Sequence, residues 1–323
     1  MRISTKWVVI GMVLRLPTAV ALAGSILLPS SDGSALGRPL QLAAAEPTAD
    51  GTPPPVEEPP VAAATQDTET VQDGTHSRAG ASSEALAKAS QNPVADMISV
   101  PIQNNMNFGF GPESKMQNIM NIQPVIPFSL NKDWNLITRT IMPIVWQPEL
   151  APGIGPESGL GDIQFSMFLS PNKAEGFIWG VGPVFQFPSA TDDLLGNGKF
   201  SAGPTAVGLL IKGHWVLGAL VQNVWSYAGD SDRKHVNQFL LQPFINYNFQ
   251  HGWYVTSAPI VTIDWTADSD DMWTVPLGGG VGKILRIGKL PVNISTQAYY
   301  NVATPEYGAD WQLRLQMQFL FPR

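Results

Sequence analysis

The feature that most constrains this chain is a strict alternation of apolar and polar residues in its last segment. Every second residue from Trp311 to Phe321 is apolar, and the residues between them are polar as far as Gln318, namely Gln312, Arg314, Gln316 and Gln318. Successive side chains of a β-strand point to opposite faces, so this pattern predicts a strand with one apolar face and one polar face. The segments that begin at Asn237 and at Pro291 repeat the pattern.

The same alternation divides the chain from Ile98 onward into twelve expected strands. They span residues 98–111, 115–130, 134–148, 160–171, 175–188, 199–212, 214–228, 236–250, 252–265, 272–284, 289–302 and 309–321. Several exceed the roughly nine to eleven residues that a tilted strand needs to cross a bilayer. Soluble proteins have a mean strand length of only about five or six residues. The lengths therefore favour strands that cross a membrane.

The connections between these strands also alternate. The short set is Leu130–Asp133, Pro171–Ala174, Lys212–Gly213, Gln250–His251 and Leu285–Gly288. The mostly longer, acidic set is Glu149–Glu157, Asp192–Gly198, Asp230–Lys234, Thr266–Asp271 and Thr304–Gly308. Short periplasmic turns and longer outer loops are typical of outer-membrane barrels. We therefore predict an all-β fold, an antiparallel transmembrane β-barrel of about twelve strands in the outer membrane of a Gram-negative bacterium. A soluble β-sandwich is the alternative, although its strands would be shorter.

Tryptophans near the expected strand ends support the membrane interpretation. They are Trp134, Trp146, Trp215, Trp225, Trp253, Trp265, Trp273 and Trp311. Amphipathic rings settle at the headgroup level, so we expect these residues to form aromatic girdles against outer-membrane lipid and lipopolysaccharide. Phe321 is a candidate recognition signal for the barrel-assembly machinery, although Pro322 and Arg323 follow it.

The first third of the chain has a different composition. No aromatic residue occurs between Trp7 and Phe108. Arg2 and Lys6 precede an apolar stretch, as in a secretory signal peptide, and we assign residues 1–45 to a signal peptide and leader. An uncleaved membrane anchor is the alternative, but Arg15 makes a spanning helix costly.

Residues 46–81 are rich in Pro, Ala and Thr, which predicts a disordered linker. Residues 82–97 form a short helical segment, in which Ser83 caps a helix over 84–90 and Asn92-Pro93 ends it. This segment either lies at the barrel mouth, where it can plug the lumen, or is a loose extension before the first strand. Residues 98–323 form the barrel.

Charge and composition exclude several functions. The net charge is −7, whereas nucleic-acid binding needs a basic surface. The chain has no cysteine, so it holds no disulfide and no thiolate metal site. On the expected topology His76, His214, His235 and His251 do not converge, and we expect neither a metal nor another cofactor. The run from Leu277 to Ile284 lacks the first glycine and the Ser or Thr of a phosphate loop, so its glycines are expected to bend the wall or make room for a plug.

The lumen face is the main candidate site. Carboxamides dominate it, and the few charges are Arg139, Asp162, Asp264 and Arg314. These charges either pair across a narrow lumen and close it, or line a constriction that selects solutes. The proposed lining also includes Gln123, Gln242, Asn246 and Gln297. Barrels of about eight strands are filled by side chains, and barrels of about sixteen strands hold a water-filled channel. Twelve strands lie between these cases, so a closed lumen and a selective constriction both remain possible.

One stretch of sequence resembles a known family. It runs from Leu86 to Pro101 and continues into Gln103-Asn104-Asn105 and Asn107-Phe108-Gly109, with weaker matches at 159–162 and 223–229. Over about residues 84–323 the chain resembles bacterial outer-membrane proteins grouped with the phenol meta-pathway degradation transporters (often mislabelled neuromedin U). The resemblance implies an outer-membrane barrel that passes small molecules, aromatic or hydrophobic ones included. It implies no catalytic residues.

The leading functional hypothesis is a passive transporter or channel for small solutes, and not an enzyme. One alternative is a structural envelope barrel tethered through residues 46–81 to a periplasmic partner. Another is an outer-membrane hydrolase, for which His235 with Asp230 or Asp232 is the one place to look. Acidic groups in the expected outer loops (Asp192/Asp193, Asp230/Asp232 and Asp268/Asp270/Asp271) are candidates to hold calcium or to bridge lipopolysaccharide phosphates.

Overall fold

The computed structural model describes residues 82–172 and 176–322. The expected signal peptide and leader at 1–45, the linker at 46–81 and His76 lie outside these residues. The described helices are α1 (Ser83–Ser90) and the 3-10 helix η1 (Gln250–Gly252). The described strands are β1 (Ile98–Phe110), β2 (Lys115–Ile122), β3 (Val125–Ser129), β4 (Trp134–Gln147), β5 (Glu157–Leu160), β6 (Ile163–Pro171), β7 (Phe177–Phe187), β8 (Lys199–Lys212), β9 (Trp215–Gly229), β10 (Asn237–Asn248), β11 (Trp253–Ser257), β12 (Val261–Asp264), β13 (Trp273–Ile287), β14 (Leu290–Ala303) and β15 (Trp311–Phe321).

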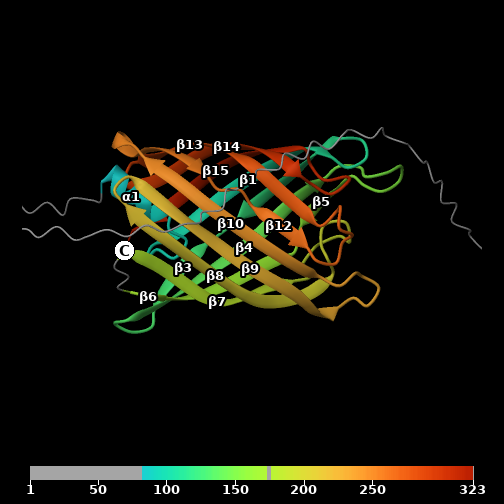
Figure 1. Cartoon of the computed structure of the whole chain (residues 1–323), viewed down its shortest axis with the longest axis horizontal. Helices are drawn as coiled ribbons and strands as arrows, with labels where there is room; N and C mark the ends of the chain where they lie inside the picture. The colour runs from blue at the N-terminus through green and yellow to red at the C-terminus, as the bar shows by residue number, and fades with distance from the viewer. Residues whose placement is uncertain (1–81, 173–175, 323) are drawn as a thin grey trace, which may run out of the picture. The chain divides into compact units, whose positions relative to one another are not determined.

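The strands form one closed antiparallel barrel (Figure 1). Fifteen segments fill twelve positions in the wall, because β2 with β3, β5 with β6 and β11 with β12 each share one position. The last strand pairs with the first along its whole length, from Ile98 opposite Phe321 to Phe108 opposite Trp311. The predicted fold class is therefore confirmed. Closure leaves no free sheet edge whose backbone groups would need water.

Three of the predicted strands are interrupted, which the alternation did not reveal. Strand 115–130 breaks at Gln123-Pro124, and 252–265 breaks at residues 258–260, where Pro259 has no N–H to donate. Strand 160–171 begins earlier, at Glu157, and breaks at Gly161-Asp162. At residues 258–260 the described ladders pair the chain with neither neighbouring strand.

Some boundaries differ from the sequence prediction. β13 continues to Ile287, so the expected turn Leu285–Gly288 is wrong, and the chain turns instead at Gly288, whose φ is +63°. Helix α1 begins at Ser83, one residue earlier than predicted. Its cap is Ser82, whose Oγ accepts a hydrogen bond from Ala85 N–H at 3.1 Å.

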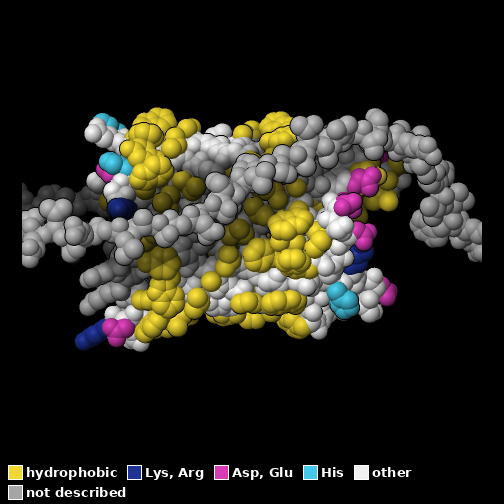
Figure 2. Space-filling view, viewed as in Figure 1, with side chains coloured by type: hydrophobic (Ala, Val, Ile, Leu, Met, Phe, Trp, Pro, Cys, Tyr) yellow, Lys and Arg dark blue, Asp and Glu magenta, His cyan; other side chains and the backbone are white. Residues whose placement is uncertain are grey.

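The barrel wall is apolar outside. On β10, Ile245 is 52% exposed, whereas the next residue, Asn246, is 4% exposed. In Figure 2 hydrophobic side chains cover the wall, and acidic, basic and histidine side chains gather toward its two ends. A closed barrel with an apolar outer band belongs in lipid, and this is the architecture of a bacterial outer-membrane protein. Among the described helices, none has the length and hydropathy of a membrane span.

The two ends of the barrel differ. We call the end where β1 starts and β15 stops the terminal end, and the opposite end the loop end. Residues 82–97, called the plug segment below, lie against the interior of the terminal end. Leu86, Ala87 and Met97 pack there with Ile284 of β13 and Leu320 of β15. The structure therefore places this segment in the barrel mouth rather than as a loose extension.

Part of the lumen is apolar, which was not predicted. We call this group of buried side chains the inner apolar cluster. It consists of Val94, Ile137, Phe168, Val207, Leu209, Val216, Leu220 and Phe244. Val94 comes from the plug segment, and the others come from β4, β6, β8, β9 and β10. The plug segment therefore contributes an apolar side chain to the barrel interior as well as packing at its mouth.

Candidate functional site in the barrel lumen

A belt of hydrogen-bonded carboxamides crosses four neighbouring strands inside the barrel. Gln117 donates to Gln147 at 2.7 Å, and Asn107 donates to Gln117 at 2.9 Å. Gln312 donates to Asn107 at 2.8 Å, which continues the belt onto β15. A carboxamide both donates and accepts, so such a belt satisfies buried polar atoms without any net charge.

Arg314 extends this belt and is the most buried charge in it, with 3% exposure. Its Nε donates to Asn105 Oδ1 at 3.2 Å, and its Nη2 donates to Gln312 Oε1 at 3.1 Å. Its Nη1 donates to the carbonyl oxygen of Ala258 at 2.9 Å. The guanidinium also lies 4.9 Å from the centre of the Tyr299 ring. Arg314 is therefore held on every side by neutral groups.

The wall break at residues 258–260 is stabilised from the lumen. Ala258 N–H donates to the Tyr299 hydroxyl at 2.9 Å, while Ala258 C=O accepts from Arg314. The Tyr299 hydroxyl in turn donates to Gln297 Oε1. Buried backbone groups need partners, and here side chains from β14 and β15 replace those of the missing ladder.

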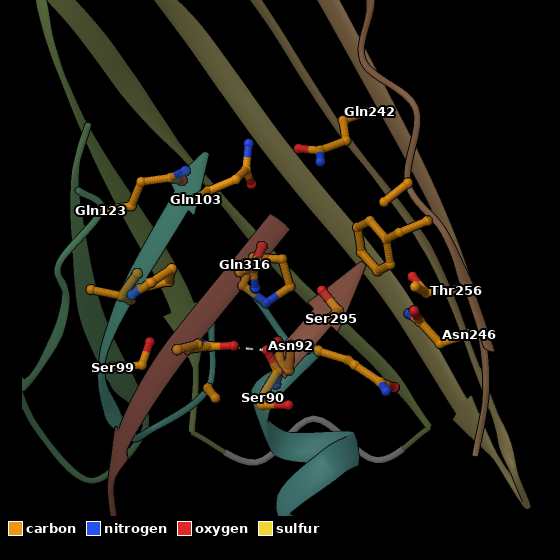
Figure 3. A pocket seen from close by; sticks show the side chains of 18 of the residues that line it. Ser90, Asn92, Ser99, Gln103, Gln123, Gln242, Asn246, Thr256, Ser295 and Gln316 are labelled. Atoms are coloured by element: carbon orange, nitrogen blue, oxygen red, sulfur yellow. Dashed lines mark hydrogen bonds between the residues drawn. The ribbon is translucent and has the colours of Figure 1, made fainter. Parts of the chain in front are cut away.

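A cavity of about 170 Å³ lies between the plug segment and this belt. Figure 3 shows α1 at its foot and carboxamides such as Gln103, Gln123 and Gln242 around it. Six of the residues expected in the lumen line this one cavity. They are Gln123, Arg139, Gln242, Asn246, Gln297 and Arg314.

Asp162 and Asp264 lie elsewhere, so pairing of these aspartates with the arginines, one of the two arrangements left open by the sequence, does not occur. Asp162 accepts hydrogen bonds from the backbone N–H groups of Ala190 at 3.3 Å and Asn197 at 2.6 Å. Asp264 accepts from the backbone N–H of Thr266 at 2.9 Å. Loop backbone therefore satisfies both carboxylates. Among the described residues, neither arginine forms a salt bridge.

Two larger cavities occupy the loop end, with volumes of about 420 and 650 Å³. Lys234, Gln238, Asp264 and Thr266 line both of them. The larger cavity also touches Asp268, Asp271 and Glu306, so its surroundings are acidic. Loops supply most of the lining of both cavities, so these cavities lie at the loop-end mouth of the barrel.

The tryptophans occupy both ends of the wall. Trp134, Trp215 and Trp253 begin their strands at the terminal end. Those toward the loop end are Trp146, Trp225, Trp265, Trp273 and Trp311. All are exposed on the wall except Trp134, which is half-buried and packs edge-on against Trp179.

His235 does not have the partner expected for a hydrolase. Its Nδ1 lies 3.5 Å from Ser226 Oγ, whereas the Asp230 carboxylate accepts from the Asp232 N–H at 2.9 Å. Ser226 Oγ also accepts from the Val236 N–H at 2.9 Å, which holds the β9–β10 connection. In the part of the chain that the structure describes, no carboxylate contacts His235, so no Ser-His-Asp triad is formed.

The remaining motifs have structural roles. A Cβ at Gly282 would lie 2.2 Å from Tyr254 Cζ, so the glycine makes room for this buried ring. Tyr254 in turn donates to Asn293 Oδ1 at 2.7 Å.

Among the described residues, His, Asp and Glu side chains form no group suited to hold a metal ion.

The comparisons with known proteins concern the fold. Neither a protein-family model nor a curated protein sequence matches the chain. The COG4313 outer membrane channel from Pseudomonas putida F1 has a TM-score of 0.55 and 16% identity, over 70% of this chain and 94% of that one. The outer membrane phospholipase A from Escherichia coli has a TM-score of 0.38 and 12% identity, over 73% and 97%. A Pseudomonas aeruginosa FadL homologue has a TM-score of 0.38 and 8% identity, over 75% and 92%. The first of these similarities agrees with the outer-membrane β-barrel that the strand pairing establishes.

Proposed function

We propose that this protein is a passive outer-membrane channel for small molecules, in which the plug segment limits passage. The observation that carries the proposal is unfilled space at both ends of the barrel. One cavity of about 170 Å³ lies above the plug segment, and two of about 420 and 650 Å³ lie toward the loop end. One solved structure with a similar fold is itself described as an outer membrane channel.

The lining of the lumen suits transport better than catalysis. Its carboxamides hydrogen-bond a polar solute without holding it in a strong field, which permits both binding and release. The described part of the chain offers no catalytic triad and no metal cluster beside this lining. We therefore propose a transporter rather than a hydrolase.

The plug segment is the element that closes the terminal end. Its apolar residues pack on the wall, and a small set of polar contacts adds to this packing, including two hydrogen bonds between Gln91 and Asn248. Ser90 Oγ accepts from Asn293 at 3.3 Å, and Glu84 Oε1 lies 3.5 Å from His214 Nδ1. Each such hydrogen bond contributes only about 0.5–1.5 kcal/mol, so the burial of Leu86, Val94 and Met97 supplies most of the stability of the closed arrangement.

The remaining assignments extend this proposal. Arg139, Arg314, Gln123, Gln242, Asn246 and Gln297 line the constriction, while Asp162 and Asp264 stand toward its loop-end entrance. The tryptophans form girdles against lipid and lipopolysaccharide, a signal peptide directs export, and the barrel-assembly machinery inserts the chain. The resemblance to phenol meta-pathway transporters is consistent with this role. No cofactor and no nucleic acid is part of the proposal.

Single-channel conductance in planar bilayers tests the proposal, together with solute-driven swelling of vesicles that contain the purified barrel. We expect small conductance steps and swelling with small neutral solutes. A correctly folded barrel that shows neither conductance nor swelling would contradict the channel.

A further inference from the structure

Arg139 carries a positive charge into a part of the lumen that has no negative charge. It belongs to β4, where its ladder neighbours are Val125 of β3 and Ser166 of β6. Ile137, two residues earlier on the same face, is fully buried in the inner apolar cluster. The neighbours of Arg139 along its own strand and on the two adjacent strands are therefore apolar or neutral.

The donors of Arg139 are mostly unused. Among the described residues it forms one hydrogen bond, from Nη2 to Gln123 Oε1 at 2.6 Å. A guanidinium has five N–H donors in a planar fork that matches a carboxylate. Arg314, by contrast, donates hydrogen bonds to Asn105, Gln312 and Ala258. Arg139 is thus the guanidinium that is available to a ligand.

The cavity that both arginines line contains no acidic side chain. Two positive charges without a carboxylate, inside a wall of low dielectric, produce a potential that attracts anions. Charged side chains inside a membrane protein are costly and mark solute pathways. A ligand anion supplies the counter-charge that the protein itself does not provide.

One side of the cavity offers an apolar surface to a ligand. Val125, Leu220 and Phe244 line it beside Arg139, and all three belong to or pack against the inner apolar cluster. A cavity of about 150 Å³ accommodates one benzene molecule, and this one measures about 170 Å³. The space therefore suits a body of about one ring.

Asp268, Asp271 and Glu306 at the loop end limit how much negative charge a ligand can bring. Their repulsion is screened over about 8 Å at physiological salt, but it grows with the charge of the solute. Among anionic solutes, one that carries a single carboxylate is repelled least.

We infer that the lumen binds small monocarboxylates with an apolar body, with the carboxylate on Arg139 and the body against Leu220 and Phe244. This inference rests on the proposed channel function and names its substrate class. Arg139 would form a bidentate pair with the carboxylate, as arginine commonly does.

Equilibrium dialysis of the purified full chain in a nonionic detergent, at pH 7, tests this site. The probes are benzoate and benzamide, which have nearly the same shape but differ in charge. We expect the wild type to bind benzoate about tenfold or more tighter than benzamide. Arg139→Gln should abolish this preference, Arg139→Lys should keep part of it, and Lys132→Gln, in an exposed turn, should leave it unchanged.

A second variant tests the apolar side. Phe244→Ala should weaken both probes by a similar factor, because it removes contact with the ring and leaves Arg139 in place. Heat-modifiable migration in gel electrophoresis shows that each variant is folded. The inference is overturned if the wild type shows no preference for benzoate, if Arg139→Gln retains it, or if Phe244→Ala binds both probes as the wild type does.

Vesicle swelling separates this inference from the channel itself. Swelling with neutral solutes but no benzoate preference would remove the carboxylate site and leave the channel. A benzoate preference that Arg139→Gln abolishes, without any swelling, would support the site and contradict passage.

Discussion

Gln91 and Asn248 hold each other by two reciprocal hydrogen bonds. Gln91 Nε2 donates to Asn248 Oδ1 at 2.9 Å, and Asn248 Nδ2 donates to Gln91 Oε1 at 3.1 Å. Asn248 is fully buried at the end of β10. The pair joins the plug segment to the wall, so it is a direct place to weaken the closure.

Gln91→Ala and Asn248→Ala should each raise the fraction of time that the channel is open. The loss of about 1 kcal/mol of docking energy corresponds to about a fivefold change in that fraction. The double variant should have an open fraction close to that of either single variant, because each substitution alone already removes both hydrogen bonds. Single-channel recordings provide the measurement. Open fractions equal to that of the wild type would contradict the role of this pair.

Arg314→Met should destabilise the barrel by about 3 kcal/mol or more. It leaves Gln312 Oε1 and the Ala258 carbonyl without their donor, and Asn105 Oδ1 keeps only the hydrogen bond from Gln103. Each unsatisfied buried group costs about 1–3 kcal/mol. Arg139→Met is the matched control, since it loses a single hydrogen bond. Urea unfolding of vesicle-inserted barrels, followed by tryptophan fluorescence, measures the difference. Equal losses in the two variants would show that Arg314 does not hold the wall break.

Gly282→Val should destabilise the barrel by about 1–3 kcal/mol through overpacking. A Cβ at this position meets the ring of Tyr254, which must move and release Asn293. Tyr254→Ala in the same chain should restore part of the loss, because the space is then free. The same unfolding measurement applies. Strict additivity of the two substitutions would rule out the contact.

The plug should loosen in acid. The hydrogen bond from Lys88, then its charge, keep the pKa of Glu84 below its usual value of 4.5, and His214 adds a smaller effect. A lowered pKa gives stability above the unfolded value, and this stability is lost as the pH falls through the folded value. Lys88 belongs to the same helix, so only the contribution of His214 depends on docking of the segment, and the open fraction should rise slightly below about pH 4.5. In Glu84→Gln this part of the rise should be missing, and an unchanged pH profile would argue against the contact.

Period-two alternation was enough to predict the barrel, because one face of each strand must meet lipid and the other the lumen. The breaks at Pro124 and Pro259 carried a signal in the missing N–H, but alternation continues through them and hides it. The inner apolar cluster also left a trace. Residues 206–211 and 215–221 are apolar on both faces, as expected where the lumen side is buried too.

The candidate site was less predictable. Alternation assigned Arg139 and Arg314 to the lumen, but it says nothing about height along the barrel. Pairing with Asp162 and Asp264 was therefore left open, whereas in the structure loop N–H groups satisfy both carboxylates. The contact of His235 with Ser226 depends on the register of a hairpin, which one sequence does not provide.

An engineered disulfide between the plug segment and the wall tests the central claim most directly. A Cβ at Gly180 would lie 3.2 Å from Val94 Cγ1, which places Val94→Cys/Gly180→Cys near disulfide geometry, and the chain has no other cysteine. Conductance is then recorded for the same protein when oxidised and after reduction. We predict that the oxidised form is closed and that reduction restores the wild-type conductance. Equal conductance in both states, or none in either state and none in the wild type, would contradict a channel limited by its plug segment.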